Sequence, residues 1–187
     1  MRLSKPRIEP LDPKTAPPEA REQLEKLAGG GLFNGRILNI FGTLAHHPEL
    51  MRRWLVFGNH ILGKSTLPER ERELAILRVG YRCKSEYEWG QHVLIAKRCG
   101  ISDEEIARVA AGPGAKGWSA ADAAVLRAAD ELHEDQMISE ATWSELVKTW
   151  NRQQLMDLVF TIGQYHLVAM ALNTFGVQRD PGVPPLP

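Results

Sequence analysis

The run from Ser85 to His92, Ser-Glu-Tyr-Glu-Trp-Gly-Gln-His, holds the residue types best suited to acid/base chemistry. On a helix, Ser85, Glu88 and His92 stand at i, i+3 and i+7 and therefore share one face. The aromatic residues Tyr87 and Trp89 flank that face. A carboxylate one turn before an imidazole can hold the ring in one tautomer and raise its pKa, which makes a base that works near neutral pH. Spacing alone also fits a solvent-exposed ion pair, but the flanking aromatic side chains favour a partly buried one.

A second acidic group lies on the preceding predicted helix, within the charged run Glu-Arg-Glu-Arg-Glu at 69–73. Only Glu73 is followed by apolar or small residues at i+3, i+4 and i+7, so it is the acid of this run that we expect to face inward. The alternative is an ordinary salt bridge from Glu73 to Arg70 or Arg72.

Glu73 and His92 are expected to meet because two helices joined by a tight connection near residues 82–84 pack antiparallel. Glu73 precedes this connection by about nine residues, roughly 13 Å of helix, and His92 follows it by about eight. Glu88 lies one turn nearer the connection. The sequence therefore predicts that Glu73, Glu88 and His92 converge on one pocket.

Helical periodicity covers almost all of the chain between its proline-rich ends, and no run alternates with the two-residue period of a strand. We predict helices near 19–27, 37–44, 50–61, 67–81, 85–98, 102–110, 119–134, 139–150 and 152–175. The fold class is therefore all-α. The predicted organisation is an extended arm at 1–18, a single helical domain at 19–178 and an irregular tail at 179–187.

Composition and charge exclude several classes of function. The chain has 187 residues with 23 basic and 23 acidic side chains, so its net charge is zero and no nucleic-acid partner is expected. The two cysteines cannot form a disulfide framework and suit a reducing cytosol. The N-terminal residues lack an apolar leader, and the most apolar stretch contains Gln164, His166 and Asn173. We therefore expect a cytoplasmic protein that has no membrane partner and acts on a small molecule.

Four segments carry a resemblance to a known family. They are Leu44-Ala-His-His-Pro-Glu-Leu-Met, Arg72-Glu-Leu-Ala-Ile-Leu-Arg78, Tyr87-Glu-Trp-Gly-Gln-His92 and Gly100-Ile-Ser. Over roughly residues 30–180 the sequence resembles the carboxymuconolactone decarboxylase family of the alkylhydroperoxidase D-like superfamily. The resemblance implies an alkylhydroperoxidase D-like helical bundle built around a central helical hairpin. It also implies a homo-oligomer, a trimer or hexamer, with the active site near a subunit interface.

The peroxidase branch of that superfamily carries Cys-x-x-Cys-x-x-x-His, with a glutamate twelve residues before the first cysteine. Alignment on His92 places Ser85 and Glu88 at the two cysteine positions, and Glu73 falls twelve residues before Ser85. The acid and the histidine are kept, while the redox pair is absent. Without a dithiol, the peroxidase chemistry of that branch lacks its electron carrier. Cys83, two positions away, is either a lone reactive thiol or a small residue at a helix junction.

The residues and the resemblance together predict a cofactor-free enzyme that catalyses proton transfer or decarboxylation, as a lyase or isomerase, on a small organic acid or lactone. His92 is the expected acid/base, Glu88 orients it, and Glu73 is a second proton-transfer group. The residues expected to shape the substrate pocket are Tyr87, Trp89, Ser85 and His47. The alternatives are an alkylhydroperoxidase-like peroxidase that uses Cys83, and a non-catalytic oligomeric protein that binds a small molecule.

The remaining histidines leave two interpretations open. His46 and His47 either line the pocket or form a polar corner before a helix, and His166 either reaches a cavity or is a hydrogen-bonded core residue. Glu73, Glu88 and His92 are ordinary metal ligands, but neither a His-x-x-x-His motif nor a cysteine cluster accompanies them. The sequence therefore predicts no metal and no cofactor.

Overall fold

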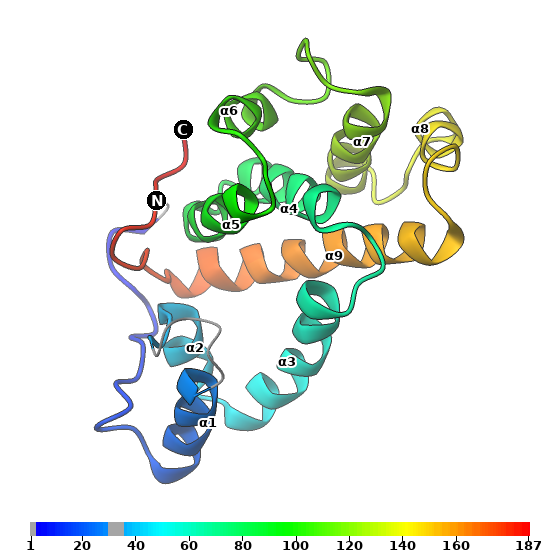
Figure 1. Cartoon of the computed structure of the whole chain (residues 1–187). Coiled ribbons are helices and arrows are strands. Elements are labelled where there is room, and N and C mark those ends of the chain that lie inside the picture. Colours follow the sequence, from blue (N-terminus) through cyan, green and yellow to red (C-terminus); the bar gives the residue numbers. More distant parts are fainter. Residues whose placement is uncertain (1–2, 30–35) are drawn as a thin grey trace.

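The structure is a computed structural model and describes residues 3–29 and 36–187. Over these residues the chain is helical and has no strands, which confirms the predicted fold class. The helices shown in Figure 1 are α1 (Pro18–Gly29), α2 (Asn39–Leu44), α3 (Pro48–Gly63), α4 (Glu69–Arg82), α5 (Glu86–Arg98), α6 (Asp103–Ala111), α7 (Ala120–Glu134), α8 (Glu140–Leu146) and α9 (Arg152–Phe175).

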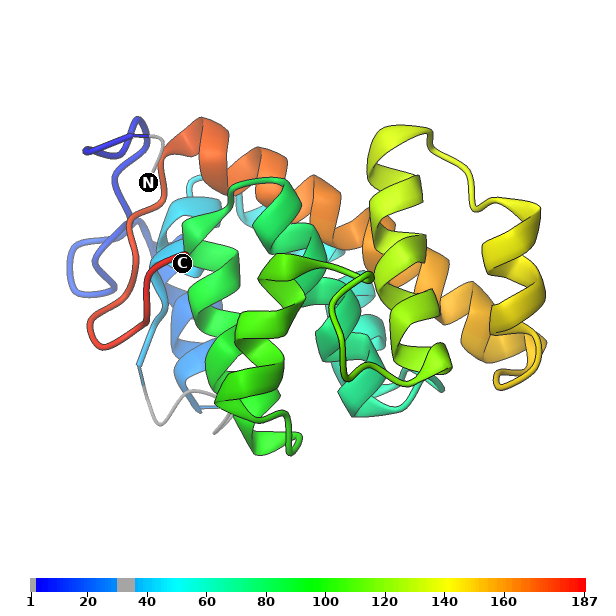
Figure 2. The same cartoon turned by 90° about the horizontal axis from the view of Figure 1, so that it is seen from above.

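Helix α4 is the centre of the main core. Nine consecutive residues, Arg72 to Gly80, are buried, so this helix has no solvent-facing side over most of its length. Helices α5, α6, α7 and α9 pack around it, and Figure 2 shows α4 and α5 side by side across α9. A charged side chain on this part of α4 must therefore find its partners inside the protein.

Side-chain caps set the starts of several helices. Ser102 and Glu105 form the capping box expected at the start of α6, and Ser139 accepts a hydrogen bond from the backbone of Thr142 at the start of α8. Helix α8 ends at Leu146, about one turn earlier than the sequence predicts. The residues that follow form turns, so the expected helix to Trp150 is too long.

Helix α9 has 24 residues and runs along the molecule beneath α4 and α5 (Figures 1 and 2). It packs against α3, α4, α5 and α7. By length and composition alone α9 could span a membrane, but half of its most apolar window is buried inside the fold, as in the core helix of a globular protein. One side of α9 stays exposed and carries the large apolar side chains Met156, Phe160, Leu167 and Met170.

The two irregular ends of the chain lie together on the body (Figure 1). The backbone amide of Arg7 donates to the carbonyl of Phe175, at the end of α9. The C-terminal segment crosses α5 at Gly90, where an added Cβ atom would lie 2.4 Å from the carbonyl oxygen of Pro184. Gly90 therefore permits an approach that any side chain would block.

Candidate active site

A buried chain of polar contacts links α4 to α5. His92 Nδ1 lies 2.7 Å from Glu73 Oε2, and Glu73 has no exposed surface. Arg72 Nε donates to the other oxygen of Glu73 at 3.1 Å, and Arg72 Nη1 donates to the carbonyl of Leu62 at 3.1 Å. The structure therefore brings Glu73 and His92 together, as predicted. Glu73 also forms the salt bridge to Arg72 that the sequence analysis gave as the alternative interpretation of this residue.

The connection between α4 and α5 explains this meeting. Only residues 83–85 separate the two helices, and the helices pack against each other. Gly80 on α4 faces α5, and a Cβ atom added to it would lie 3.3 Å from the backbone nitrogen of Trp89. The small residue therefore lets the two backbones approach closely enough for the Glu73 carboxylate to reach the His92 ring.

The partner of Nδ1 determines what His92 can do. Because Glu73 accepts the Nδ1–H hydrogen bond, Nε2 is the ring nitrogen that can exchange a proton. The ring of Tyr165, on α9, meets the His92 ring edge to face, with the ring centroids 4.7 Å apart. Two neighbouring helices thus fix the imidazole, α4 by a hydrogen bond and α9 by packing. Sequence reasoning missed Tyr165 because nothing in its local pattern distinguishes it from other buried residues of α9.

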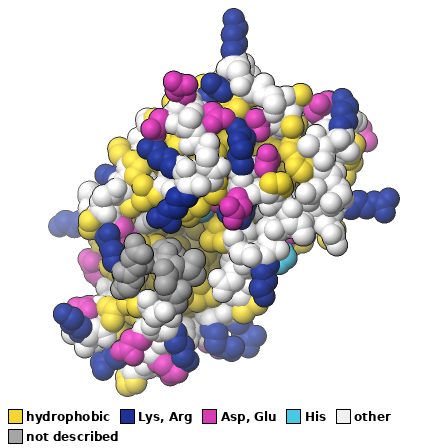
Figure 3. All heavy atoms as spheres, in the orientation of Figure 1, with side chains coloured by type: hydrophobic (Ala, Val, Ile, Leu, Met, Phe, Trp, Pro, Cys, Tyr) yellow, Lys and Arg dark blue, Asp and Glu magenta, His cyan; other side chains and the backbone are white. Residues whose placement is uncertain are grey.

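A cavity of about 550 Å³ lies between α2 and α3 on one side and α5 and α9 on the other. Its polar lining residues include Tyr87, Glu88, Gln91, His92, Gln164 and Tyr165. Most of the remaining lining is aliphatic or aromatic, from residues such as Ile40, Phe41 and Trp54. Figure 3 shows hydrophobic side chains gathered in the hollow between the α1–α3 region and the rest of the molecule. The volume and the mixture of groups suit a small organic ligand.

Glu88 lines this cavity but does not orient His92, which corrects the expected pairing. The i, i+4 spacing is present, yet Nδ1 of the His92 ring points across to Glu73 on α4. Both carboxyl oxygens of Glu88 are buried and have no hydrogen-bond partner among the described residues. Burial raises the pKa of Glu88 well above its ordinary value. Burial therefore favours the neutral form of Glu88, which can donate a hydrogen bond or a proton into the cavity.

Gln164 adds a second polar group of the same kind. Its side chain is buried on α9 and lines the cavity, and its Nε2 has no hydrogen-bond partner among the residues that the structure describes. A buried donor without a partner costs free energy, which a bound ligand can recover. The cavity thus offers Glu88, Gln164 and His92 Nε2 to one ligand.

Tyr87 lines the cavity as expected, but its hydroxyl is already engaged. It donates to Asp180 Oδ2 at 2.6 Å, and Gln91 Nε2 donates to the same oxygen at 2.6 Å. Burial and the Asp180 carboxylate raise the pKa of Tyr87. Tyr87 therefore holds the C-terminal segment against the cavity wall and does not supply protons. Asp180 escaped sequence reasoning because it lies in a segment without periodicity.

Three other expected pocket residues lie elsewhere. Trp89 packs against Tyr81 with ring centroids 5.9 Å apart, because it points from α5 toward α4 and away from the cavity. Ser85 is buried, but it is the N-cap residue of α5 and precedes the helix, so the i, i+3, i+7 rule does not apply to it. His47 is the N-cap residue of α3, where its ring accepts a hydrogen bond from the backbone of Leu50. None of the three is among the described residues that line the cavity.

The neutral state of Glu88 predicts a pH-dependent stability. Because its pKa is higher in the folded than in the unfolded protein, its contribution is fully present below the ordinary carboxyl value of about 4.5 and is lost as pH rises through the folded value. We expect Glu88→Gln to remove this loss. The unfolding free energy of the wild type minus that of the variant should fall with rising pH, by at most about 1.4 kcal/mol per pH unit.

Urea unfolding between pH 5 and 9 measures this difference. Glu69→Gln is a matched control, because Glu69 lies on the exposed first turn of α4. A difference between wild type and Glu88→Gln that stays constant over this range would show that Glu88 ionises normally in the folded protein.

Comparisons with known proteins agree with this fold. The carboxymuconolactone decarboxylase family matches residues 48–131, which include both Glu73 and His92. None of the curated proteins matches the chain significantly. Among solved structures, an uncharacterized peroxidase-related protein from Silicibacter sp. TM1040 has a TM-score of 0.79 at 17% identity, covering 97% of both chains.

Two further solved structures share the fold. The alkylhydroperoxidase AhpD core of an uncharacterized peroxidase-related protein from Ralstonia eutropha JMP134 has a TM-score of 0.77 at 18% identity, covering 93% of both chains. The debrominase Bmp8 in complex with 2,3,4-tribromopyrrole has a TM-score of 0.76 at 16% identity, covering 93% of this chain and 91% of the debrominase. At these identities the likeness establishes an AhpD-like fold.

Proposed function

We propose that this chain, which belongs to the carboxymuconolactone decarboxylase family through residues 48–131, is an enzyme that moves a proton on a small organic acid or lactone. The outcome of that proton transfer is decarboxylation or a shift of a double bond. The observation that carries the proposal is the buried Glu73–His92 pair at the wall of a cavity of about 550 Å³. A histidine held by a buried carboxylate is a common device for acid/base catalysis.

In this proposal the proton-transfer step uses the Nε2 atom of His92, because Nδ1 is engaged with Glu73. Nε2 takes a proton from a carbon next to a carbonyl group or returns one to it. Glu73 stabilises the imidazolium that forms, and Arg72 keeps the carboxylate of Glu73 in place. This arrangement gives Glu73 a supporting role through His92, in place of a separate proton-transfer role.

The negative charge that develops on the substrate oxygen needs hydrogen-bond donors in the cavity wall. Burial favours the neutral form of Glu88, and Gln164 Nε2 is an amide donor without a partner among the described residues. Donors already aimed at a developing oxyanion stabilise the transition state more than the ground state. Carboxyl groups in two different environments thus take two roles, with Glu73 supporting the base and Glu88 acting as the acid.

The lining also favours an anionic substrate of modest size. Lys64 is the one cationic side chain among the described residues that line the cavity, and it follows directly after α3. A carboxylate at Lys64 would leave the rest of the ligand against apolar walls and the reacting carbon toward His92. Small lactone acids and enol-forming carboxylic acids have this combination of charge and apolar surface.

The test is a set of reactions in deuterated water. We expect the protein to place deuterium on a carbon atom of at least one small γ-lactone acid or β,γ-unsaturated acid. Proton NMR measures this as the loss of a carbon-bound proton signal. Where the reaction is a decarboxylation, carbon dioxide should also be released. A compound that raises the melting temperature without any exchange would favour the binding-protein interpretation over an enzyme.

The peroxidase alternative is tested in the same assay series with organic hydroperoxides. Two of the similar structures are peroxidase-related by name, but Cys83 is not among the described residues that line the cavity. We therefore expect no hydroperoxide reduction at enzymatic rates. Hydroperoxide turnover that is lost in Cys83→Ser and kept in Cys99→Ser would overturn the proposal.

We also propose that the active form is a homo-oligomer, a trimer or hexamer. The exposed apolar side chains of α9 continue onto α3 through Phe57, whose ring meets Phe160 edge to face with centroids 6.1 Å apart. An apolar stripe of this length on the surface of a monomer is unusual and marks an interface. A second copy of the chain can bury the stripe against its own, as symmetric oligomers do.

Light scattering tests the oligomer directly. The wild type should have a multiple of the 20.9 kDa chain mass at micromolar concentration, and Phe160→Glu combined with Met170→Glu should shift it to the monomer. Met137→Glu is the control, because Met137 is equally exposed but lies on the connection between α7 and α8. A wild type that scatters as a 20.9 kDa monomer would exclude this assembly.

A further inference from the structure

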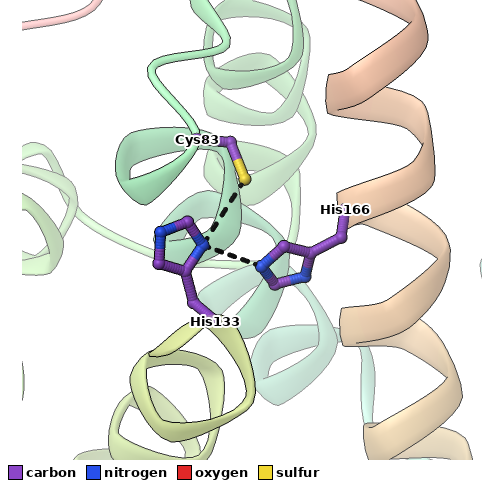
Figure 4. Close-up of side chains that lie close together, drawn as sticks. All are labelled: Cys83, His133 and His166. Atoms are coloured by element: carbon purple, nitrogen blue, oxygen red, sulfur yellow. Dashed lines mark hydrogen bonds between the residues drawn. The ribbon is translucent and has the colours of Figure 1, made fainter. Parts of the chain in front are cut away.

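Three side chains with metal-binding atoms come together on the far side of α9 from the cavity. Cys83 is the C-cap residue of α4, His133 lies in the last turn of α7, and His166 lies on α9 (Figure 4). Their sulfur and ring nitrogen atoms all lie within 4.8 Å of one another. We propose that Cys83, His133 and His166 bind one zinc ion or a divalent metal ion of similar ligand preference.

The distances fit a tetrahedral ion. Zinc bonds of about 2.3 Å to sulfur and 2.0–2.1 Å to nitrogen place a sulfur and a nitrogen about 3.6 Å apart and two nitrogens about 3.3 Å apart. Cys83 Sγ lies 3.8 Å from His133 Nδ1, and His133 Nδ1 lies 3.0 Å from His166 Nε2. These two distances differ by a few tenths of an ångström from the tetrahedral values, and the sulfur and the His166 nitrogen, which lie within 4.8 Å of each other, would close to about 3.6 Å around the ion.

Hydrogen bonds around the cluster hold the donor atoms in position. His166 Nδ1 donates to the carbonyl of Ile162 at 2.8 Å, so the lone pair of Nε2 faces the cluster. Metal-binding histidines commonly donate their second N–H group to a backbone carbonyl in this way. Asn173 Nδ2 donates to the carbonyl of Cys83 at 3.0 Å, which ties the α4 terminus to α9. Without metal, His133 Nδ1–H donates to His166 Nε2. When an ion binds at Nδ1, that proton moves through solvent to Nε2 of the same ring, which stays neutral.

The charges near the cluster are compatible with a cation. The neutral form of the His133 ring is the one that binds metals. Arg82 forms ion pairs with Asp130 and Glu134, so its positive charge is offset close to the site. The thiol of Cys83 loses its proton to solvent when it binds the ion.

The site is separate from the candidate active site. Tyr165 contacts His92, while the next residue, His166, points to a different side of α9, as consecutive helical residues do. None of the three cluster residues is among the described residues that line the cavity. All three are partly exposed, so water can reach the fourth coordination position. One metal ion here would tie α4, α7 and α9 together.

Cobalt titration of the reduced, metal-free full chain tests the proposal, because Co²⁺ reports its ligands by absorption. We expect one equivalent to bind with a thiolate-to-cobalt charge-transfer band and the visible bands of a four-coordinate ion, and Zn²⁺ to abolish both. Cys83→Ser should lose the charge-transfer band and weaken binding at least about 100-fold, because loss of a direct ligand costs at least as much as loss of a ligand's hydrogen-bond partner. Cys99→Ser is the matched control and should retain the wild-type spectrum.

Two histidine variants keep the test decisive if Cys83→Ser folds poorly. His133→Gln and His166→Gln should each weaken cobalt binding at least about 10-fold, while His46→Gln, whose ring contacts the backbone of Glu9, should not. Circular dichroism without metal verifies that each variant is folded. A wild type that binds no cobalt at tens of micromolar, or a Cys83→Ser spectrum identical to that of the wild type, would overturn the proposal.

Discussion

Replacing His92 with alanine is expected to reduce turnover of the organic-acid substrate by at least about 100-fold. The physical reason is that Nε2 of His92 is the group that exchanges the proton, and no other imidazole lines the cavity among the described residues. The fold should tolerate the change, because the truncated ring leaves space that opens into the existing cavity. Steady-state kinetics on the substrate found by deuterium exchange measures the loss.

His47→Ala is the matched control for this experiment. Both residues are histidines, but His47 caps α3 and lies outside the cavity lining. It should cost only the free energy of a helix cap, about 1 kcal/mol, and leave turnover unchanged. Exogenous imidazole, which is small enough for the vacated space, should restore part of the activity of His92→Ala. Equal losses in the two histidine variants would remove His92 from the mechanism.

Replacing Glu73 with alanine is expected to lower the unfolding free energy by about 3–5 kcal/mol. The carboxylate is fully buried between the Arg72 guanidinium and the His92 ring. Its removal leaves a buried cation without its anion, which costs far more than the loss of a surface ion pair. Chemical denaturation at neutral pH measures the change. Glu69→Ala, on the exposed first turn of the same helix, should change stability by no more than about 0.5 kcal/mol.

Glu73→Gln separates the structural from the catalytic role of this residue. The amide keeps the shape of the side chain and one acceptor oxygen, so the protein should stay folded. One of the two carboxylate oxygens becomes an NH₂ donor, so the hydrogen bond from either Arg72 or His92 is lost, and the neutral amide does not stabilise the imidazolium. Turnover should therefore fall at least about 100-fold at full substrate saturation. Normal turnover in a folded Glu73→Gln variant would show that the carboxylate serves stability alone.

Local pattern and helix geometry account for the parts of the site that were predicted. The helical period identified α4 and α5, and the short connection between them required an antiparallel arrangement. Counting residues from that connection placed Glu73 and His92 at equal heights, and the structure joins them by a 2.7 Å contact. The structure does not give Glu88 the expected role of orienting His92, because the carboxylate of Glu73 on α4 contacts the ring instead. Spacing along α5 alone cannot reveal a carboxylate on a second helix.

Contacts between distant parts of the chain account for what sequence reasoning missed. Tyr165 approaches His92 from α9, and Asp180 binds Tyr87 from a segment with no regular structure. The metal-binding cluster joins residues that are 50 and 33 positions apart. Such neighbours arise from the packing of whole helices, so neither composition nor periodicity indicates them.

The hydrogen bond from Tyr87 to Asp180 also bears on the order in which the protein becomes functional during synthesis. It joins residues 93 positions apart, and the ribosome delivers the N-terminal partner first. Helices α4 and α5 can therefore pair, and the Glu73–His92 contact can form, while α9 and the segment beyond it are still being made. The cavity gains its last lining residues only with α9, and the hydroxyl of Tyr87 gains its partner only when residue 180 emerges. A nascent chain would carry the acid/base pair early, before α9 and the segment that holds Tyr87 have been made.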